Sequence, residues 1–195
     1  MYFIPAPEFI SVICPKCEKY ATFKKSVGVA NIEKADRKYF ENSKHFDTFY
    51  TKHYGRYQYE VWYDAGLSNP LDNIHDLPEG YSAGVFKRSK YLRPLPNFSR
   101  GVISCNNCTL RRRTNIDWPK QAYFKLDYRN NILWAYDRKM ALAILEYLKD
   151  PSRKKVSQSI RNKTSYNWLN NLPTVFQTKK ATPHVIKKLE KLLAS

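Results

Sequence analysis

The four cysteines of this chain form two pairs with the same spacing, and the pairs lie far apart in the sequence. Cys14 and Cys17 stand in CPKC, and Cys105 and Cys108 stand in CNNC. A CxxC turn places two sulfur atoms close enough to occupy two corners of a tetrahedral metal site, so two such turns complete one site. The sequence therefore predicts that a single metal ion joins the N-terminal region to residues 105–108.

Three other states of the cysteines are open: two disulfides, an iron site with the same four ligands, and free thiols in a core. A disulfide within CxxC is strained and reducible, and we expect a cytoplasmic chain whose thiols stay reduced. Four soft sulfur ligands favour Zn²⁺ as a structural cofactor, although a rubredoxin-like iron site has the same ligands. We therefore predict zinc.

Each cysteine pair follows a β-prone run, FISVI in one case and GVIS in the other. This order of strand and turn resembles the knuckles of a zinc ribbon, a motif class that implies a structural zinc ion and names no specific family. Ribbon knuckles often carry Gly after the second cysteine, but this chain has Glu18 and Thr109 there, so we expect looser turns. Residues 18–104 are also far longer than the hairpins of a small ribbon, which predicts a large insertion.

The remaining patterns predict an α+β protein with zinc-ribbon-like knuckles closing an antiparallel β region, followed by C-terminal helices. Residues 56–66 alternate as a strand, and Asp137 precedes an amphipathic helix that Pro151 ends. Between two aromatic-rich strands, Arg129, Asn130 and Asn131 suit a hairpin turn, because Asn tolerates a positive φ angle. A last helix is expected to begin with Thr182 as its N-cap and Pro183 as its first residue. We expect a four-cysteine domain over residues 1–150 and a basic linker with a helix packed on that domain over residues 151–195.

The formal charge of +17 and the pI of about 9.7 predict attraction to polyanions. Residues 1–100 hold 15 Lys and Arg against 11 Asp and Glu, whereas residues 101–195 hold 19 against 6. The N-terminus lacks a basic region and a long apolar run, and no segment is long and apolar enough to span a membrane. We expect a cytoplasmic protein that makes no membrane contact.

Basic runs of the second part are candidates for contact with the phosphate backbone of DNA or RNA. One run begins three positions after a predicted metal ligand, which would hold its backbone in place. We therefore predict a zinc-stabilised nucleic-acid-binding module, accessory to a larger system. The predicted contacts are Arg111, Arg112, Arg113, Arg153, Lys154, Lys155, Arg161 and Lys163.

Exposed aromatic rings would add base stacking, but most aromatic residues on strands pack in a core or a hairpin. The stacking candidates are Tyr54, Tyr57, Trp62, Trp118, Tyr123, Tyr128 and Trp168.

Two alternatives to nucleic-acid binding remain open. The basic surface would equally suit an interaction subunit that docks on an acidic protein. A metal-dependent nuclease would need a histidine beside an acidic residue, and Asn73, His75 and Asp76 offer these groups in an order that departs from the known pattern. The sequence shows no catalytic triad and no phosphate-binding glycine loop, so it favours a binding protein over an enzyme and indicates no small-molecule substrate.

Overall fold

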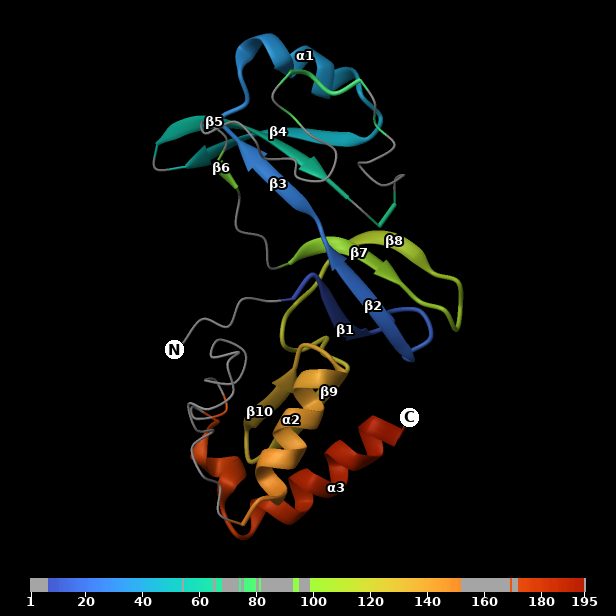
Figure 1. Cartoon of the computed structure of the whole chain (residues 1–195), viewed down its shortest axis with the longest axis vertical. Helices are drawn as coiled ribbons and strands as arrows, with labels where there is room; N and C mark the ends of the chain where they lie inside the picture. The colour runs from blue at the N-terminus through green and yellow to red at the C-terminus, as the bar shows by residue number, and fades with distance from the viewer. Residues whose placement is uncertain are drawn as a thin grey trace. The chain divides into compact units, whose positions relative to one another are not determined.

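The computed structural model describes residues 7–53, 55–64, 66–67, 74, 76–79, 81, 93–94, 99–151, 169 and 172–194. It confirms the α+β class, because antiparallel sheets are combined with helices, the last of them at the C-terminus (Figure 1). The chain divides into two compact units. Unit 1 comprises Met1–Ile13 and Trp118–Ser195, and unit 2 comprises Cys14–Asp117.

The first sheet of unit 2 contains β2 (Tyr20–Lys25), β7 (Arg100–Ser104) and β8 (Arg111–Asn115). The order is β2-β7-β8, and both pairings are antiparallel. Glycine is required at position 101 of β7, beside the paired strand β2, because a Cβ atom there would lie 2.3 Å from the carbonyl oxygen of Lys24. The two strands therefore pair without a side chain between them.

The second sheet of unit 2 has the order β4-β5-β3-β6. Its strands are β4 (Phe46–His53), β5 (Arg56–Tyr63), β3 (Val27–Ala30) and β6 (Arg93–Pro94). Helix α1 (Lys34–Asn42) buries Phe40 against a core that includes Phe46, Val61 and Tyr63. Figure 1 shows β2 running on into β3, so one continuous stretch of chain contributes a strand to each sheet.

The alternation predicted for residues 56–66 is confirmed by β5. Tyr59, Val61 and Tyr63 are buried on the face toward α1, while Trp62 on the other face is half-buried. The indole of Trp62 lies flat over Gly28 of the neighbouring strand, where a Cβ would approach the ring to 2.7 Å. The absence of a side chain at Gly28 thus leaves the space that the Trp62 ring occupies.

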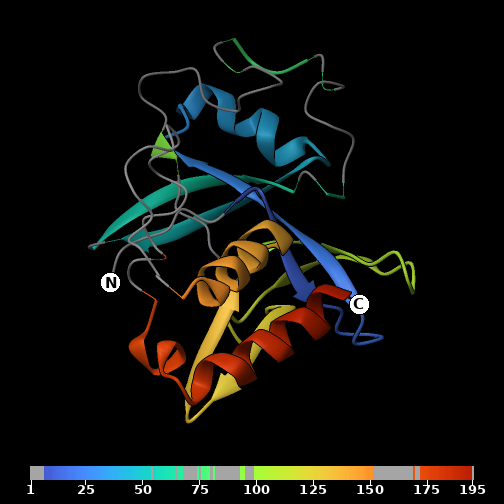
Figure 2. The same cartoon turned by 60° about the horizontal axis from the view of Figure 1, so that its bottom comes forward.

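Unit 1 is built from a hairpin and two long helices. The hairpin pairs β9 (Phe124–Tyr128) with β10 (Asn131–Ala135), and α2 (Arg138–Lys149) and α3 (Ala181–Ala194) pack on it, as Figure 2 shows. The short 3₁₀ helix η3 (Thr174–Gln177) precedes α3. Strand β1 (Phe9–Ile13) joins this unit through a bridge between Val12 and Ala122.

Two predicted features of unit 1 are confirmed and one is wrong. Asp137 caps α2 by accepting a 2.7 Å hydrogen bond from the Met140 N–H, and Arg129 and Asn130 form the hairpin turn with positive φ angles. Helix α3, however, begins at Ala181 and not after Thr182. Thr178 is its cap, because the Thr178 hydroxyl accepts a bond from the Ala181 N–H at 3.2 Å. Thr182 is buried in the first turn.

Within the described ranges, no helix combines the length and the apolar character that crossing a membrane requires.

Candidate metal centre

The four predicted cysteines lie together in unit 2. The Sγ atoms of Cys14 and Cys108 are 3.6 Å apart, as are those of Cys17 and Cys105, and all four sulfur atoms lie within 4.8 Å of one another. Cys14 and Cys105 are buried, and Cys17 and Cys108 are partly exposed. The prediction that these residues form one cluster is therefore confirmed.

Strand pairing brings the two knuckles together. Strand β7 leads into the second knuckle, and β2 leads out of the first. Because the two strands are antiparallel, with Thr22 opposite Ser104, the start of β2 lies beside the end of β7. Cys17 and Cys105 thus meet although 88 residues separate them.

Both knuckles have the same backbone geometry. The N–H of Cys14 donates to the carbonyl of Lys19 at 2.8 Å, and the N–H of Cys105 donates to the carbonyl of Leu110 at 2.9 Å. The residues after the second cysteines, Glu18 and Thr109, have φ angles of 59° and 56°. The expectation of looser turns was wrong, because both residues adopt the left-handed conformation that glycine usually supplies.

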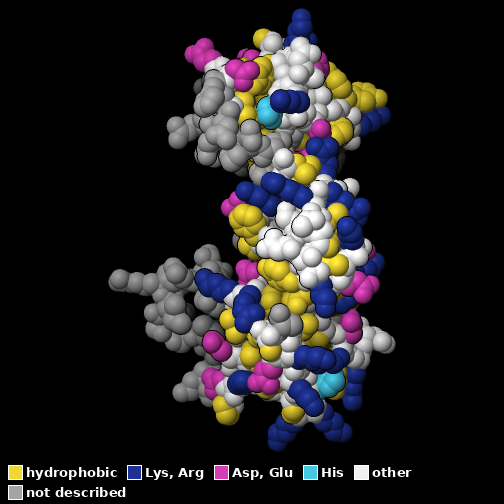
Figure 3. Space-filling view, turned by 90° about the vertical axis from the view of Figure 1, so that its right-hand side faces the viewer, with side chains coloured by type: hydrophobic (Ala, Val, Ile, Leu, Met, Phe, Trp, Pro, Cys, Tyr) yellow, Lys and Arg dark blue, Asp and Glu magenta, His cyan; other side chains and the backbone are white. Residues whose placement is uncertain are grey.

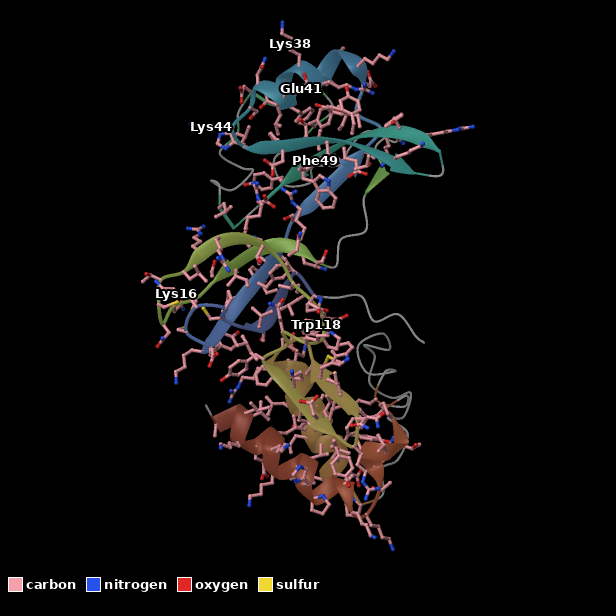
Figure 4. The ribbon with its side chains drawn as sticks, turned by 180° about the vertical axis from the view of Figure 1, so that it is seen from behind. Lys16, Lys38, Glu41, Lys44, Phe49 and Trp118 are labelled. Carbon is pink, nitrogen blue, oxygen red and sulfur yellow. The ribbon has the colours of Figure 1, made fainter. Side chains whose placement is uncertain are left out.

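Backbone N–H groups stabilise negative charge on the first knuckle. The Lys19 N–H lowers the pKa of Cys17 to about 6. Burial opposes ionisation of Cys14, but the N–H groups of Lys16 and Cys17 outweigh it, so the pKa of Cys14 is also lowered. Since the thiolate is the form that binds metals, this knuckle is prepared for a cation. Figure 4 shows Lys16 on the same knuckle, beside the sulfur atoms.

The sulfur positions fit a bound metal ion. Tetrahedral Zn²⁺ with four thiolates at about 2.3 Å would place the sulfur atoms about 3.8 Å apart. The observed 3.6 Å separations are close to this value and far longer than the roughly 2.05 Å of a disulfide. All four residues are free cysteines, so this cluster can hold a metal ion and contains no disulfide.

The three arginines after the second knuckle lie on β8 and differ in their surroundings. Arg111 donates its Nε–H to the carbonyl of Gly66. Arg113 forms ion pairs with Asp47 and Asp64. Arg112 is exposed, and no ion pair of Arg112 is found within the described part of the chain. Of the three, Arg112 therefore has the guanidinium that is most available to a ligand.

Sequence reasoning missed a cluster of four charged side chains that joins the two sheets of unit 2. Arg100 of β7 and Arg113 of β8 both contact Asp47 of β4 and Asp64, which follows β5. Asp64 is only 3% exposed and also accepts a hydrogen bond from the Ser26 hydroxyl. Two guanidinium groups face two carboxylates, so the cluster is electrically balanced. No sequence signal could have found it, because its members are distant along the chain.

The other predicted sites fall outside the described residues. This applies to Arg153, Lys154, Lys155, Arg161 and Lys163, and also to His75.

Among the stacking candidates that the structure describes, Trp62, Trp118, Tyr123 and Tyr128 are partly buried by packing, as expected. Trp118 stacks on Tyr136 at a centroid distance of 5.1 Å, and Tyr123 and Tyr128 pack against the core of unit 1. Tyr57 is the exception, with 77% of its surface exposed. Tyr54 and Trp168 lie outside the described residues.

Comparison with known proteins adds no assignment to this geometry. No protein-family model, curated protein or solved structure matches the chain.

Proposed function

We propose that this protein is a zinc-stabilised module that binds the phosphate backbone of nucleic acid. The metal part of the proposal is supported by the all-sulfur donor set and its near-tetrahedral spacing. Zinc there has a structural role, because all four coordination positions are taken by cysteines and none is left for a substrate. In this role zinc closes the zinc-ribbon-like knuckles and holds β8 in place.

The observation that carries the nucleic-acid part is the excess of positive charge on each unit. Unit 1 has 16 Lys and Arg against 6 Asp and Glu, and unit 2 has 18 against 11. A zinc ion with four thiolates adds a net charge of about −2 to unit 2, which leaves it basic. Figure 3 shows Lys and Arg side chains spread among neutral and hydrophobic ones instead of forming one stripe. Each of these side chains is a separate candidate for contact with a phosphate group.

Helix α3 and β8 supply the cations that are best placed for such contacts. The outer side of α3 exposes Lys187, Lys188 and Lys191, while Glu190 on the same helix is paired with Lys149 at 2.7 Å. On β8, the exposed cation beside the second knuckle is Arg112. Arg111 and Arg113 hold parts of unit 2 together and are less available.

The test is fluorescence anisotropy of the metal-loaded protein with labelled single- and double-stranded DNA and RNA over a salt series. The logarithm of the affinity should fall linearly with the logarithm of the salt concentration. Changing Lys187, Lys188 and Lys191 together to Gln should make the slope shallower, and Arg112→Gln should reduce it by about 0.9 for duplex DNA. Elemental analysis of the same preparation identifies the metal and separates zinc from iron.

Lys149→Gln is the matched control, because it removes a charge on unit 1 that is already paired with Glu190. The slope should be unchanged in this variant. Absence of binding to every polymer at low salt would contradict the nucleic-acid proposal, and the basic surface would then be assigned to an acidic protein partner. Metal-free protein with intact strands would contradict the structural role of the ion.

A further inference from the structure

The outer half of the β4–β5 hairpin carries two tyrosines with little cover. Tyr57 is 77% exposed and Tyr50 is 62% exposed. In the hairpin register, Tyr50 lies opposite Tyr59 and Lys52 lies opposite Tyr57. Opposed residues share a face of the sheet, and this is the face that α1 covers at the other end of the hairpin. The helix therefore leaves the outer half of this face open.

Cations lie over the rings of this face. The Cζ atom of Arg37 lies 4.7 Å from the ring centroid of Tyr59 and 6.0 Å from that of Tyr50, and the Nζ atom of Lys52 lies 5.9 Å from that of Tyr57. The rings of Tyr50 and Tyr59 also meet edge to face at 5.0 Å. We refer to Arg37, Tyr50, Lys52 and Tyr57 as the hairpin surface. It combines exposed aromatic faces with positive charge.

Charges of both signs lie near the hairpin surface. Arg56 is exposed at the turn of the hairpin, on the opposite face from Tyr57, and Lys38 projects outward from α1, away from the sheet (Figure 4). Glu41 of α1 lies near the hydroxyl of the buried Tyr59, and Asp36 stands in the first turn of the same helix. On the opposite face of the sheet, the ring centroid of Phe49 lies 5.2 Å from the Cζ atom of Arg100, and 41% of the Phe49 side chain is exposed.

We propose that the hairpin surface binds single-stranded nucleic acid by stacking unpaired bases on Tyr50 and Tyr57, with Lys52 and Arg37 near the phosphates. This inference rests on the proposed nucleic-acid function and names the form of the polymer. Base faces are free in single strands and occupied by neighbouring base pairs in a duplex, so exposed rings favour unpaired bases. Tyrosine rings and cations also occur together at protein interfaces, so the comparison of strands below decides between unpaired bases and an acidic protein partner.

The experiment compares two labelled strands of equal length and equal phosphate number, an oligothymidylate and an abasic strand. The full-length, metal-loaded protein should bind the oligothymidylate at least about tenfold more tightly, because each stacked base adds affinity that the abasic strand cannot provide. Oligouridylate in a third arm distinguishes RNA from DNA.

Three variants assign that preference to the hairpin surface. Changing Tyr50 and Tyr57 together to Thr keeps residues that favour strands but removes the rings, so the preference over the abasic strand should disappear. Changing both to Phe keeps the rings and should keep the preference. Tyr20→Thr is the matched control, since Tyr20 is an exposed tyrosine, 47% accessible, in the other sheet of the same unit.

The possible outcomes separate the two proposals. Equal binding of the wild-type protein to both strands would overturn the stacking inference and leave phosphate binding intact, and this comparison requires no variant to fold. A preference that survives in the Thr double variant would also overturn it. Failure to bind either strand would remove the proposed function as well.

Discussion

Glu18 and Thr109 show how strongly the cysteine cluster determines the local backbone. Neither residue favours a positive φ, and from the sequence we expected looser turns at both places. The structure has φ angles of 59° and 56° because each knuckle must turn back at once, with the first cysteine N–H reaching a carbonyl five residues later. Convergence of four sulfur atoms on one point fixes both turns, whatever residue stands there.

Glycine at these two positions should therefore stabilise the protein. Glu18→Gly and Thr109→Gly each remove a left-handed conformation that disfavours side chains, and we expect a gain of about 0.5–1 kcal/mol in the free energy of unfolding per site. Urea denaturation of the metal-loaded protein measures the change. Asn106→Gly, at an exposed position of the second knuckle without positive φ, serves as the control and should be destabilising. A loss of stability at residues 18 and 109 would count against this account.

At the scale of elements, local sequence patterns predicted individual helices and turns better than they predicted which elements pack or pair with one another. Helix α2 was found from Asp137 and an apolar stripe, and the β9–β10 turn from Arg129 and Asn130. Helix α1 has no clear sequence pattern, because Phe40 is its one fully buried residue and a single residue supplies no periodicity. The start of α3 was misplaced because both Thr178 and Thr182 suit a cap, and tertiary packing buries Thr182.

Sheet membership was not predictable from the alternation of residues. Strands β2 and β3 form one extended run in the sequence, yet β2 pairs with β7 and β3 pairs with β5. The change occurs at Ser26, whose hydroxyl donates to Asp64. Long-range ion pairs of Asp64 then hold the two sheets together, and such pairs leave no trace in local sequence.

The ion cluster between the two sheets predicts a large effect of Asp64→Asn. Removing a buried carboxylate that faces Arg100 and Arg113 should lower the free energy of unfolding by about 3 kcal/mol. Asp47→Asn is the matched control, and it should cost less because Asp47 is 29% exposed. Urea denaturation at neutral pH compares the two variants. Equal effects would show that burial of Asp64 is not what makes the cluster important.

The same variant gives a pH test. Burial alone would raise the pKa of Asp64, but the Ser26 hydroxyl and the guanidinium groups of Arg100 and Arg113 outweigh it, so the pKa is lowered. A lowered pKa stabilises the folded state above the unfolded value of about 3.9, and this contribution is lost as the pH falls through the folded pKa. The stability difference between wild type and Asp64→Asn should thus shrink below about pH 4. A constant difference down to pH 3 would contradict the assignment.

At the scale of the whole molecule, the metal site and the division into units make a joint prediction. All four cysteines belong to unit 2, so a metal ion bound to them would close the sheet of β2, β7 and β8, while unit 1 has a hydrophobic core of its own. Removing the metal with a chelator should therefore expose the amides of these strands to hydrogen exchange and leave those of α2 and α3 protected. Mass spectrometry of exchanged peptides measures both regions at once.

Two results would contradict this prediction. Unchanged protection of β2 and β7 after chelation would mean that the ion adds no order to unit 2. Equal loss of protection in α2 and α3 would mean that the two units do not unfold independently. Re-addition of Zn²⁺ should restore the protection and is the control for irreversible damage.

The positions of the cysteines in the sequence also determine when the metal site can assemble during translation. Cys17 is made 88 residues before Cys105, which at about 5–20 residues per second is a delay of roughly 4–18 s. During that interval the first knuckle holds two thiols without their partners. The bridge from Val12 of β1 to Ala122 can form only later still, because Ala122 follows the whole of unit 2 in the sequence. The ribosome thus releases β1 before unit 2 exists, and unit 1 is completed only afterwards.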